Sequence, residues 1–233
     1  MSLSILEDVQ SGKSPRPIIG VLYGTHGVGK STFAANTPDH IIIDCENGLG
    51  RLDCRRTPYL SSYMVIKEWL DALITDPHEY KTVIIDTLDW MMRRIEEEVT
   101  GSGSNLTATL NKAQGGYGNG KKVLINYVFG EVIPTLNKLS QKGINVIMLA
   151  HACQRDVVDA DGITVTKTAP DVAQDFVMPF LEWSDFVGLC RVDDGTRWIQ
   201  MVESETVVAK NRLGIEKGIP MEWTALEEAA NNG

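Results

Sequence analysis

The nine residues GTHGVGKST, at positions 24–32, constrain the fold of this chain more than any other segment. They match the pattern GxxxxGK[ST] at every fixed position and directly follow an apolar, strand-like run, PIIGVLYG (17–24). Glycines in such a loop let the backbone turn its N–H groups inward around phosphate groups, and the helix that begins there adds partial positive charge. The loop therefore predicts a nucleoside triphosphate site on a strand–loop–helix unit, a context that a chance glycine turn before a lysine would not explain.

Two residues of this loop have specific predicted roles. Lys30 is expected to reach the β- and γ-phosphates, and the Ser31 hydroxyl is expected to bind Mg²⁺. The sequence does not distinguish ATP from GTP, because base contacts come from loops with no readable code. ATP and Mg²⁺ are the predicted cofactors, and the predicted nucleotide-binding residues are Gly24, Thr25, His26, Gly27, Val28, Gly29, Lys30, Ser31 and Thr32.

The rest of the first two thirds of the chain alternates between strands and helices. Further short, continuously apolar runs at 40–45, 81–87 and 144–151 are typical of parallel strands covered on both faces. Helical patterns follow Lys30 and occupy 61–74, 89–99 and 121–141, with Pro134 expected to kink or break the last one. This order predicts right-handed crossovers and an α/β fold, a wound and mainly parallel sheet flanked by helices.

The pattern changes near the C-terminus. Residues 184–204 predict two antiparallel strands joined by an Asp-Asp-Gly turn, and 205–211 a third strand. Segments 101–120 and 154–180 are too polar, or too rich in Gly and Pro, for regular structure, and such long loops are often functional. We expect one domain with an N-terminal arm (1–16), a core (17–151), a long loop (152–180), C-terminal strands (181–215) and a tail (216–233).

Composition limits the class of protein. The chain has 233 residues, of which 43% are hydrophobic and 23% charged, as in a soluble globular protein. No apolar run approaches the roughly 18 residues of a membrane span, and the first residues lack the pattern of a signal peptide, so a cytoplasmic location without membrane association is expected. The four cysteines have no CxxC spacing and no nearby His pair, which argues against a zinc site or a disulfide framework. The formal charge of −9 gives no global case for nucleic acid, so any such binding needs a local patch.

Two strand ends carry acidic candidates. In YKTVIIDTLD, Asp86 ends a buried strand and is expected to hold Mg²⁺ through water. Thr87 follows, where many ring-forming ATPases place the water-activating Glu, so the base must come from elsewhere. In HIIIDCENGLG, Glu46 could polarise the attacking water, provided that its strand runs beside the P-loop strand. Asp44 could support the loop or the metal's water shell; alternatively, both carboxylates only cap the NGLG turn.

These segments resemble the RecA recombinases. IIIDCENGLG resembles the RecA segment whose glutamate activates water, which implies that role for Glu46. VIIDT resembles the RecA strand ending in Asp-Ser, and INVIMLAH the strand ending in the γ-phosphate-sensing glutamine, which His151 replaces. SETVVAKNRLGI is similar to the RecA segment whose two lysines reach a neighbour's nucleotide, which implies that Lys210 and Arg212 act between subunits. From the residues alone, His151 could equally be structural and the basic pair a solvated strand face.

The compact form, with a minimal N-terminal arm and no sizeable C-terminal DNA-gathering domain, is most similar to phage-encoded RecA-like proteins, including Sak-type single-strand annealing proteins. The resemblance implies a role in phage recombination or replication, in the host bacterial cytoplasm, as a filament or ring. It implies single-stranded DNA and a phage single-strand binding protein as partners. The DNA would contact the loops near 100–122 and 152–180, although the second loop also carries aspartates and both could be flexible without DNA. The candidate DNA-binding residues are Tyr117, Lys121, Lys122, Arg155 and Lys167.

Three functions stay open at this point. The first is a DNA-stimulated ATPase that promotes annealing or strand exchange, its site completed between subunits. The second is a small-molecule kinase with the same P-loop, for which RLDCRR (51–56) is the only arginine cluster. The third is a nucleotide-dependent switch or motor accessory that acts on a protein partner. The favoured first function assigns Lys30, Ser31, Glu46, Asp86 and His151 in cis, with Lys210 and Arg212 in trans.

Overall fold

Four apolar segments form the centre of the protein as neighbouring parallel strands: β1 (Ile19–Gly24), β2 (His40–Asp44), β3 (Thr82–Asp86) and β4 (Asn145–Val158). The computed structural model describes residues 9, 11–12, 16–101, 109–158 and 162–232. Within them, a sheet runs in the order β2-β3-β4-β1-β6-β7-β9, with β5 paired to β4 and β8 to β6. The predicted α/β fold, a wound and mainly parallel sheet, is confirmed.

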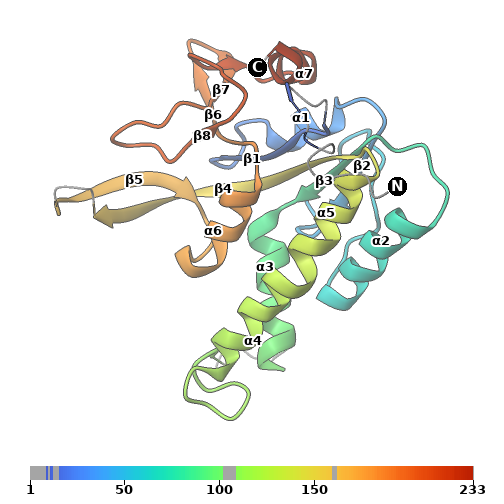
Figure 1. Ribbon diagram of the computed structural model, residues 1–233, viewed down its shortest axis with the longest axis vertical. Coiled ribbons are helices and arrows are strands. Elements are labelled where there is room, and N and C mark those ends of the chain that lie inside the picture. The colour runs from blue at the N-terminus through green and yellow to red at the C-terminus, as the bar shows by residue number, and fades with distance from the viewer. Residues whose placement is uncertain (1–8, 10, 13–15, 102–108, 159–161, 233) are drawn as a thin grey trace.

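Helices cover both faces of this sheet (Figure 1). One face packs against α2 (Tyr63–Thr75), α3 (Leu88–Thr100), α4 (Asn119–Tyr127), α5 (Ile133–Gln141) and α6 (Gln174–Trp183). The other face packs against α1 (Lys30–Ala35) and α7 (Trp223–Asn232). Strand residues contribute alternately to the two cores, as Ile41 and Ile43 do to the first and Ile42 to the second. This explains why the strands are apolar throughout. Among the helices of the described residues, none is long and apolar enough to cross a membrane.

The helical segment predicted at 121–141 is interrupted, but it is not broken at Pro134. A π-helical turn, Val128–Val132, lies between α4 and α5, and Pro134 is in the first turn of α5. Proline lacks the N–H that an α-helix requires at this point, and the wider turn before it accommodates that loss.

The prediction of a long loop at 152–180 is wrong. β4 continues to Val158 and pairs antiparallel with β5 (Thr164–Pro170), after which α6 begins. The two strands form a ribbon that extends away from the sheet (Figure 1). Polar side chains link its strands: Thr166 Oγ1 donates to Asp156 Oδ1 at 2.6 Å, and Gln154 Nε2 donates to Thr168 Oγ1 at 3.2 Å. A ribbon with two largely solvated faces needs few apolar residues, so the apolar pattern stopped at its base.

The C-terminal strands extend the sheet beyond β1. β6 (Phe186–Asp193) is parallel to β1 and forms a hairpin with β7 (Thr196–Gln200), and the predicted turn is confirmed by positive φ angles at Asp194 and Gly195. The third strand is shorter than predicted, because only β8 (Lys210–Asn211) pairs with β6. The predicted tail contains β9 (Ile219–Pro220) and α7. Most of the predicted N-terminal arm lies outside the described residues.

One assumption about strand order is also wrong. β2 does not lie beside β1, because β3 and β4 separate them. The carboxyl ends of these strands nevertheless meet at one edge, where Asp44 is level with Asp86 and Gly24 with His151. This edge is where wound α/β sheets bind ligands.

Candidate nucleotide-binding site

The P-loop connects β1 to α1 in a conformation that needs glycine. Gly29 has a φ of 110° and Gly27 a φ of 76°, which disfavour residues with a side chain. A Cβ atom on Gly24 would lie 2.8 Å from the Cys190 carbonyl oxygen. Lys30 is buried, and its Nζ donates to the carbonyl oxygens of Gly24 at 2.8 Å and Thr25 at 3.0 Å. Burial lowers the pKa of Lys30.

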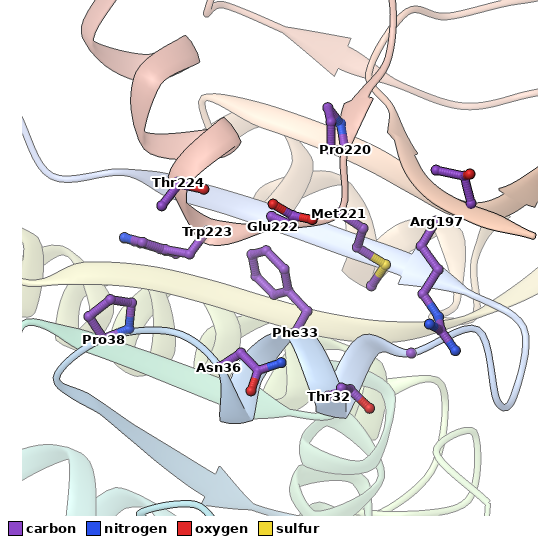
Figure 2. Close-up of a pocket in the computed structure, with 12 residues that line it drawn as sticks. Thr32, Phe33, Asn36, Pro38, Arg197, Pro220, Met221, Glu222, Trp223 and Thr224 are labelled. Atoms are coloured by element: carbon purple, nitrogen blue, oxygen red, sulfur yellow. The ribbon is translucent and has the colours of Figure 1, made fainter.

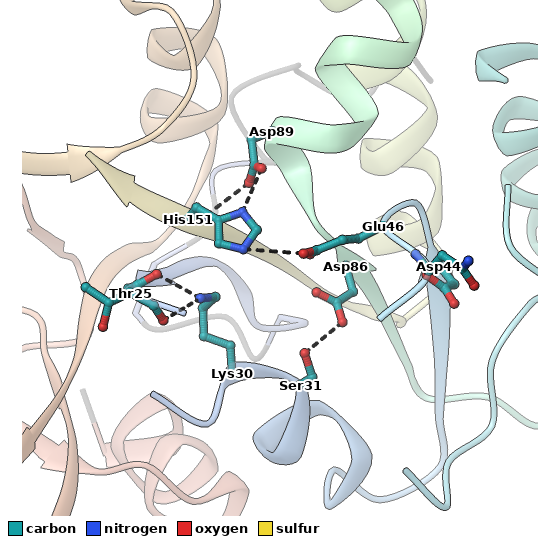
Figure 3. A network of polar contacts seen from close by, with 10 residues as sticks. Thr25, Lys30, Ser31, Asp44, Glu46, Asp86, Asp89 and His151 are labelled. Carbon is teal, nitrogen blue, oxygen red and sulfur yellow. Dashed lines mark hydrogen bonds and ion pairs between the residues drawn. The ribbon is translucent and has the colours of Figure 1, made fainter. Parts of the chain in front are cut away.

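Ser31 and Asp86 form the oxygen pair expected for a magnesium site. Ser31 Oγ donates to Asp86 Oδ2 at 3.0 Å (Figure 3), and the peptide between Asp86 and Thr87 is cis. Burial raises the pKa of Asp86 to about 6, although the hydrogen bond from Ser31 opposes this. Asp86 Oδ1 is buried without a hydrogen-bond partner among the described residues. An orphaned carboxylate oxygen beside a hydroxyl fits Mg²⁺, which prefers oxygen ligands and retains several waters.

The two carboxylates after β2 have different environments. Asp44 Oδ1 accepts a hydrogen bond from the Asn47 backbone N–H at 2.7 Å, so this side chain stabilises the turn. Glu46 instead extends towards β4, where its Oε1 lies 3.6 Å from His151 Nε2 (Figure 3). The turn-capping alternative therefore describes Asp44 and not Glu46.

His151 is held by Asp89, a residue that the sequence reading did not single out. Asp89, in the first turn of α3, accepts from His151 Nδ1 at 2.8 Å and from its backbone N–H at 3.0 Å. The hydrogen bond that His151 donates to Asp89 raises the pKa of His151, although burial opposes it. Burial alone would raise the pKa of Asp89, but the hydrogen bonds from His151 outweigh it and lower that pKa. The only available sequence signal was an acidic residue at the start of a helix, three positions after Asp86.

One cavity of about 270 Å³ brings together Lys30, Ser31, Glu46, Asp86 and His151, which come from four separate segments. Its lining includes P-loop residues, Glu46, Asp86, His151 and Arg197 of β7. A second cavity, of about 430 Å³, shares Gly29, Thr32 and Arg197 with it. Figure 2 shows this second cavity between α1, which contributes Phe33, and the segment leading into α7. The smaller cavity is lined mainly by polar residues, whereas the larger one is partly aromatic, with Phe33 and Trp223 in its lining.

Residues 16–213 match the family model described as an AAA domain. The chain belongs to this family. A search of curated proteins found no match. Among solved structures, the chain is similar to the flagellar accessory protein FlaH from Methanocaldococcus jannaschii, with 10% identity and a TM-score of 0.42 over 94% of this chain and 91% of that one. This AAA-domain protein is thus a P-loop ATPase.

In this AAA-domain protein, the basic residues predicted to act between subunits are not among the residues that line the P-loop cavity. Lys210 Nζ donates to the carbonyl oxygens of Leu181 and Glu182, both at 2.7 Å, at the C-terminus of α6. Burial lowers the pKa of Lys210. Arg212 is exposed, and its backbone N–H donates to the Asp185 carbonyl oxygen.

The candidate DNA-binding residues are partly engaged within the chain. Lys121 pairs with Asp175 at 2.7 Å, and Lys167 with Glu203 at 2.8 Å. Arg155 donates to the carbonyl oxygens of Pro170 and Val172. By contrast, the remaining two are exposed to solvent, Tyr117 at 99% and Lys122.

Arg197 of this AAA-domain protein also had no sequence signal. Its Nε donates to the Val28 carbonyl oxygen at 3.0 Å, and a Cβ on Gly29 would lie 2.8 Å from that nitrogen. The hairpin that carries Arg197 starts more than 150 residues after the P-loop, so only the folded sheet reveals that this side chain lies between the two cavities.

Proposed function

We propose that the protein binds Mg²⁺–ATP in the P-loop cavity and hydrolyses it while acting on single-stranded DNA, in phage recombination or replication. The observation that carries the nucleotide half of this proposal is the convergence of Lys30, Ser31, Glu46, Asp86 and His151 on one cavity. Lys30 neutralises phosphate charge, and Ser31 with Asp86 holds the metal, which supplies charge stabilisation. The base and ribose lie in the adjoining cavity, between α1 and the start of α7.

Glu46 is the proposed water-activating base. It is a half-buried carboxylate that faces the cavity, whereas Asp44 is occupied by the turn. His151, anchored by Asp89, donates a hydrogen bond to the γ-phosphate and transmits its loss to the ribbon of β4 and β5. Lys210 and Arg212 complete the site of a neighbouring subunit in a filament or ring, so hydrolysis depends on assembly.

Fewer observations support the part of the proposal that concerns DNA binding. The Lys121–Asp175 ion pair joins the first predicted DNA segment to the second at 172–175, the stretch that Arg155 also contacts through the Val172 carbonyl oxygen. Tyr117 and Lys122 are both exposed. Tyr117 lies in the turn before α4, and Lys122 lies in the first turn of α4. An exposed aromatic ring beside cations suits sequence-tolerant binding of a single strand.

Hydrolysis measured at low salt, with and without single-stranded DNA and over a range of protein concentrations, tests the proposal. We expect DNA stimulation that rises cooperatively with protein. Glu46→Gln should still bind ATP but hydrolyse it at least about 100-fold more slowly, whereas the exposed Glu68→Gln should behave as wild type. Lys30→Ala should lose nucleotide binding or turnover. Normal hydrolysis by Glu46→Gln would refute the role of Glu46.

The DNA contact has its own measurement. Lys122→Ala should weaken DNA binding and lower the slope of log affinity against log salt by about 0.7, the value for one phosphate contact on a single strand. Lys142→Ala, an exposed lysine just beyond α5, is the matched control and should leave the slope unchanged. Equal slopes for both variants would contradict the proposed DNA surface.

One observation favours a second candidate, a nucleotide-dependent switch that acts on a protein. Val158 and Ile163, at the far end of the ribbon, are 65% and 60% exposed, and apolar side chains at a projecting tip suit a protein partner. Tight ATP binding with a flat response to DNA and protein concentration would support this candidate over the first.

A further inference from the structure

Three potential metal ligands meet in the P-loop cavity, although they are far apart in the sequence. They are His26 of the P-loop, Glu46 after β2 and His151 of β4, and their ligand atoms all lie within 4.8 Å of one another. His151 Nε2 lies 3.6 Å from Glu46 Oε1, and the centroids of the two imidazole rings lie 4.1 Å apart. Three elements thus direct two imidazoles and a carboxylate to one point.

Asp89 prepares His151 for a metal. Because Nδ1 donates to Asp89 Oδ2 at 2.8 Å, the neutral imidazole has its lone pair on Nε2, the atom that faces Glu46. A carboxylate behind a ligating histidine is the usual arrangement in metal sites, where it fixes the ring and increases its basicity. The second bond, from the His151 backbone N–H to Asp89 Oδ1, keeps this carboxylate in place.

The donor set selects the class of ion. Two imidazole nitrogens and one carboxylate oxygen, with a fourth position open to the cavity, suit Zn²⁺ and similar transition metals, whereas Mg²⁺ prefers oxygen ligands. Ligand atoms around tetrahedral Zn²⁺ are separated by about 3.3 Å, given bonds of about 2.0–2.1 Å. The Glu46–His151 pair is already close to this spacing. His26 is exposed, so its ring can approach by the remaining distance.

We propose that the nucleotide-free protein binds one Zn²⁺-class ion through His26, Glu46 and His151 Nε2. This site is separate from the Ser31–Asp86 pair that fits Mg²⁺. The carboxylates of Glu46 and Asp89 balance the charge of the ion, and the Lys30 ammonium, which shares the cavity, donates to the carbonyl oxygens of Gly24 and Thr25. The ion joins the P-loop to β4. If the triphosphate occupies the same cavity, as in the proposed function, the ion competes with the nucleotide.

Zinc titration of untagged, nucleotide-free protein by calorimetry tests the site, with Co²⁺ as a spectroscopic probe. We expect one equivalent to bind and the Co²⁺ protein to show the intense visible absorption of tetrahedral coordination. His26→Ala should weaken binding at least about tenfold, and Asp89→Asn, which alters the support of His151, by about 10–100-fold. His78→Ala removes a histidine outside the cavity and should bind as wild type.

Equal zinc affinities for His26→Ala and His78→Ala, with circular dichroism showing that both are folded, would overturn the site. The pale spectrum of octahedral Co²⁺ would do the same. Because no nucleotide is present, the result is independent of hydrolysis: a protein that binds zinc without hydrolysing ATP refutes only the proposed function. Competition is measured with a fluorescent ATP analogue, whose binding zinc should weaken in wild type but not in His26→Ala.

Discussion

Replacing Asp89 by alanine should destabilise the protein far more than removing a surface carboxylate with an ion pair of similar length. Asp89 Oδ2 lies 2.8 Å from His151 Nδ1, and these side chains are only 14% and 11% exposed. Asp71 Oδ2 lies 2.6 Å from Lys67 Nζ on α2, but there the side chains are 48% and 34% exposed. The two pairs differ mainly in their access to water.

The expected magnitudes follow from this difference. Removing one partner of a buried ion pair lowers the free energy of unfolding by about 3–5 kcal/mol, because the other partner stays buried without its hydrogen bonds. Asp89→Ala should fall in this range, since both the His151 ring and its backbone N–H lose their acceptor. Asp89→Asn retains one acceptor and should cost about 1–3 kcal/mol. Asp71→Ala should cost less than about 1 kcal/mol, as exposed pairs do.

Equilibrium urea unfolding at pH 7 without nucleotide, followed by tryptophan fluorescence and far-UV circular dichroism, measures these values. The denaturant dependence should be the same in all variants, so that midpoint shifts report stability. Free energies for Asp89→Ala and Asp71→Ala within about 1 kcal/mol of each other would refute the reasoning, because they would show that the Asp89–His151 pair is hydrated.

Two further substitutions test the packing around the P-loop strand. Gly20→Ala would place a Cβ 2.1 Å from the fully buried Phe186 ring, so the free energy of unfolding should fall by about 1–3 kcal/mol or more. Adding Phe186→Leu should recover part of this loss in urea unfolding, and strictly additive effects would contradict the clash. Tyr23→Phe removes a hydroxyl that lies 2.6 Å from the Val208 carbonyl oxygen and 3.0 Å from that of Thr168. The free energy of unfolding should therefore fall by about 1–3 kcal/mol. A melting temperature equal to that of wild type would show that this hydroxyl does not stabilise the C-terminal segment.

The features predicted from the sequence are those encoded in continuous segments. The P-loop and the strand ending in Asp86 combine a fixed motif with an apolar run, and both occur as predicted. Glu46 extends towards the cavity even though β2 is not beside β1, because the turn held by Asp44 directs the chain towards β4. The assumed strand order was wrong, but β1, β2 and β3 end at the same edge of the sheet, where β4 passes through His151.

The features that were missed depend on contacts between distant segments. Asp89 gains its importance only when α3 places it against the end of β4, and Arg197 only when the β6–β7 hairpin places it beside the P-loop. The ribbon of β4 and β5 was missed for a different reason. Three successive cross-strand pairs in its middle, from Gln154–Thr168 to Asp156–Thr166, are polar, so hydrophobic periodicity, which reports burial, gives no continuous signal there.

The length of β4 has a mechanical consequence. One continuous strand of 14 residues begins in the buried core, passes through His151 and ends at the far end of the ribbon. From His151 to Val158 the chain advances seven residues, about 23 Å at roughly 3.3 Å per residue. With a pivot at His151, a rotation of only about 5° displaces Val158 by about 2 Å over that length. A rigid strand of this length would therefore amplify small rotations beside the P-loop into larger displacements at the end of the ribbon.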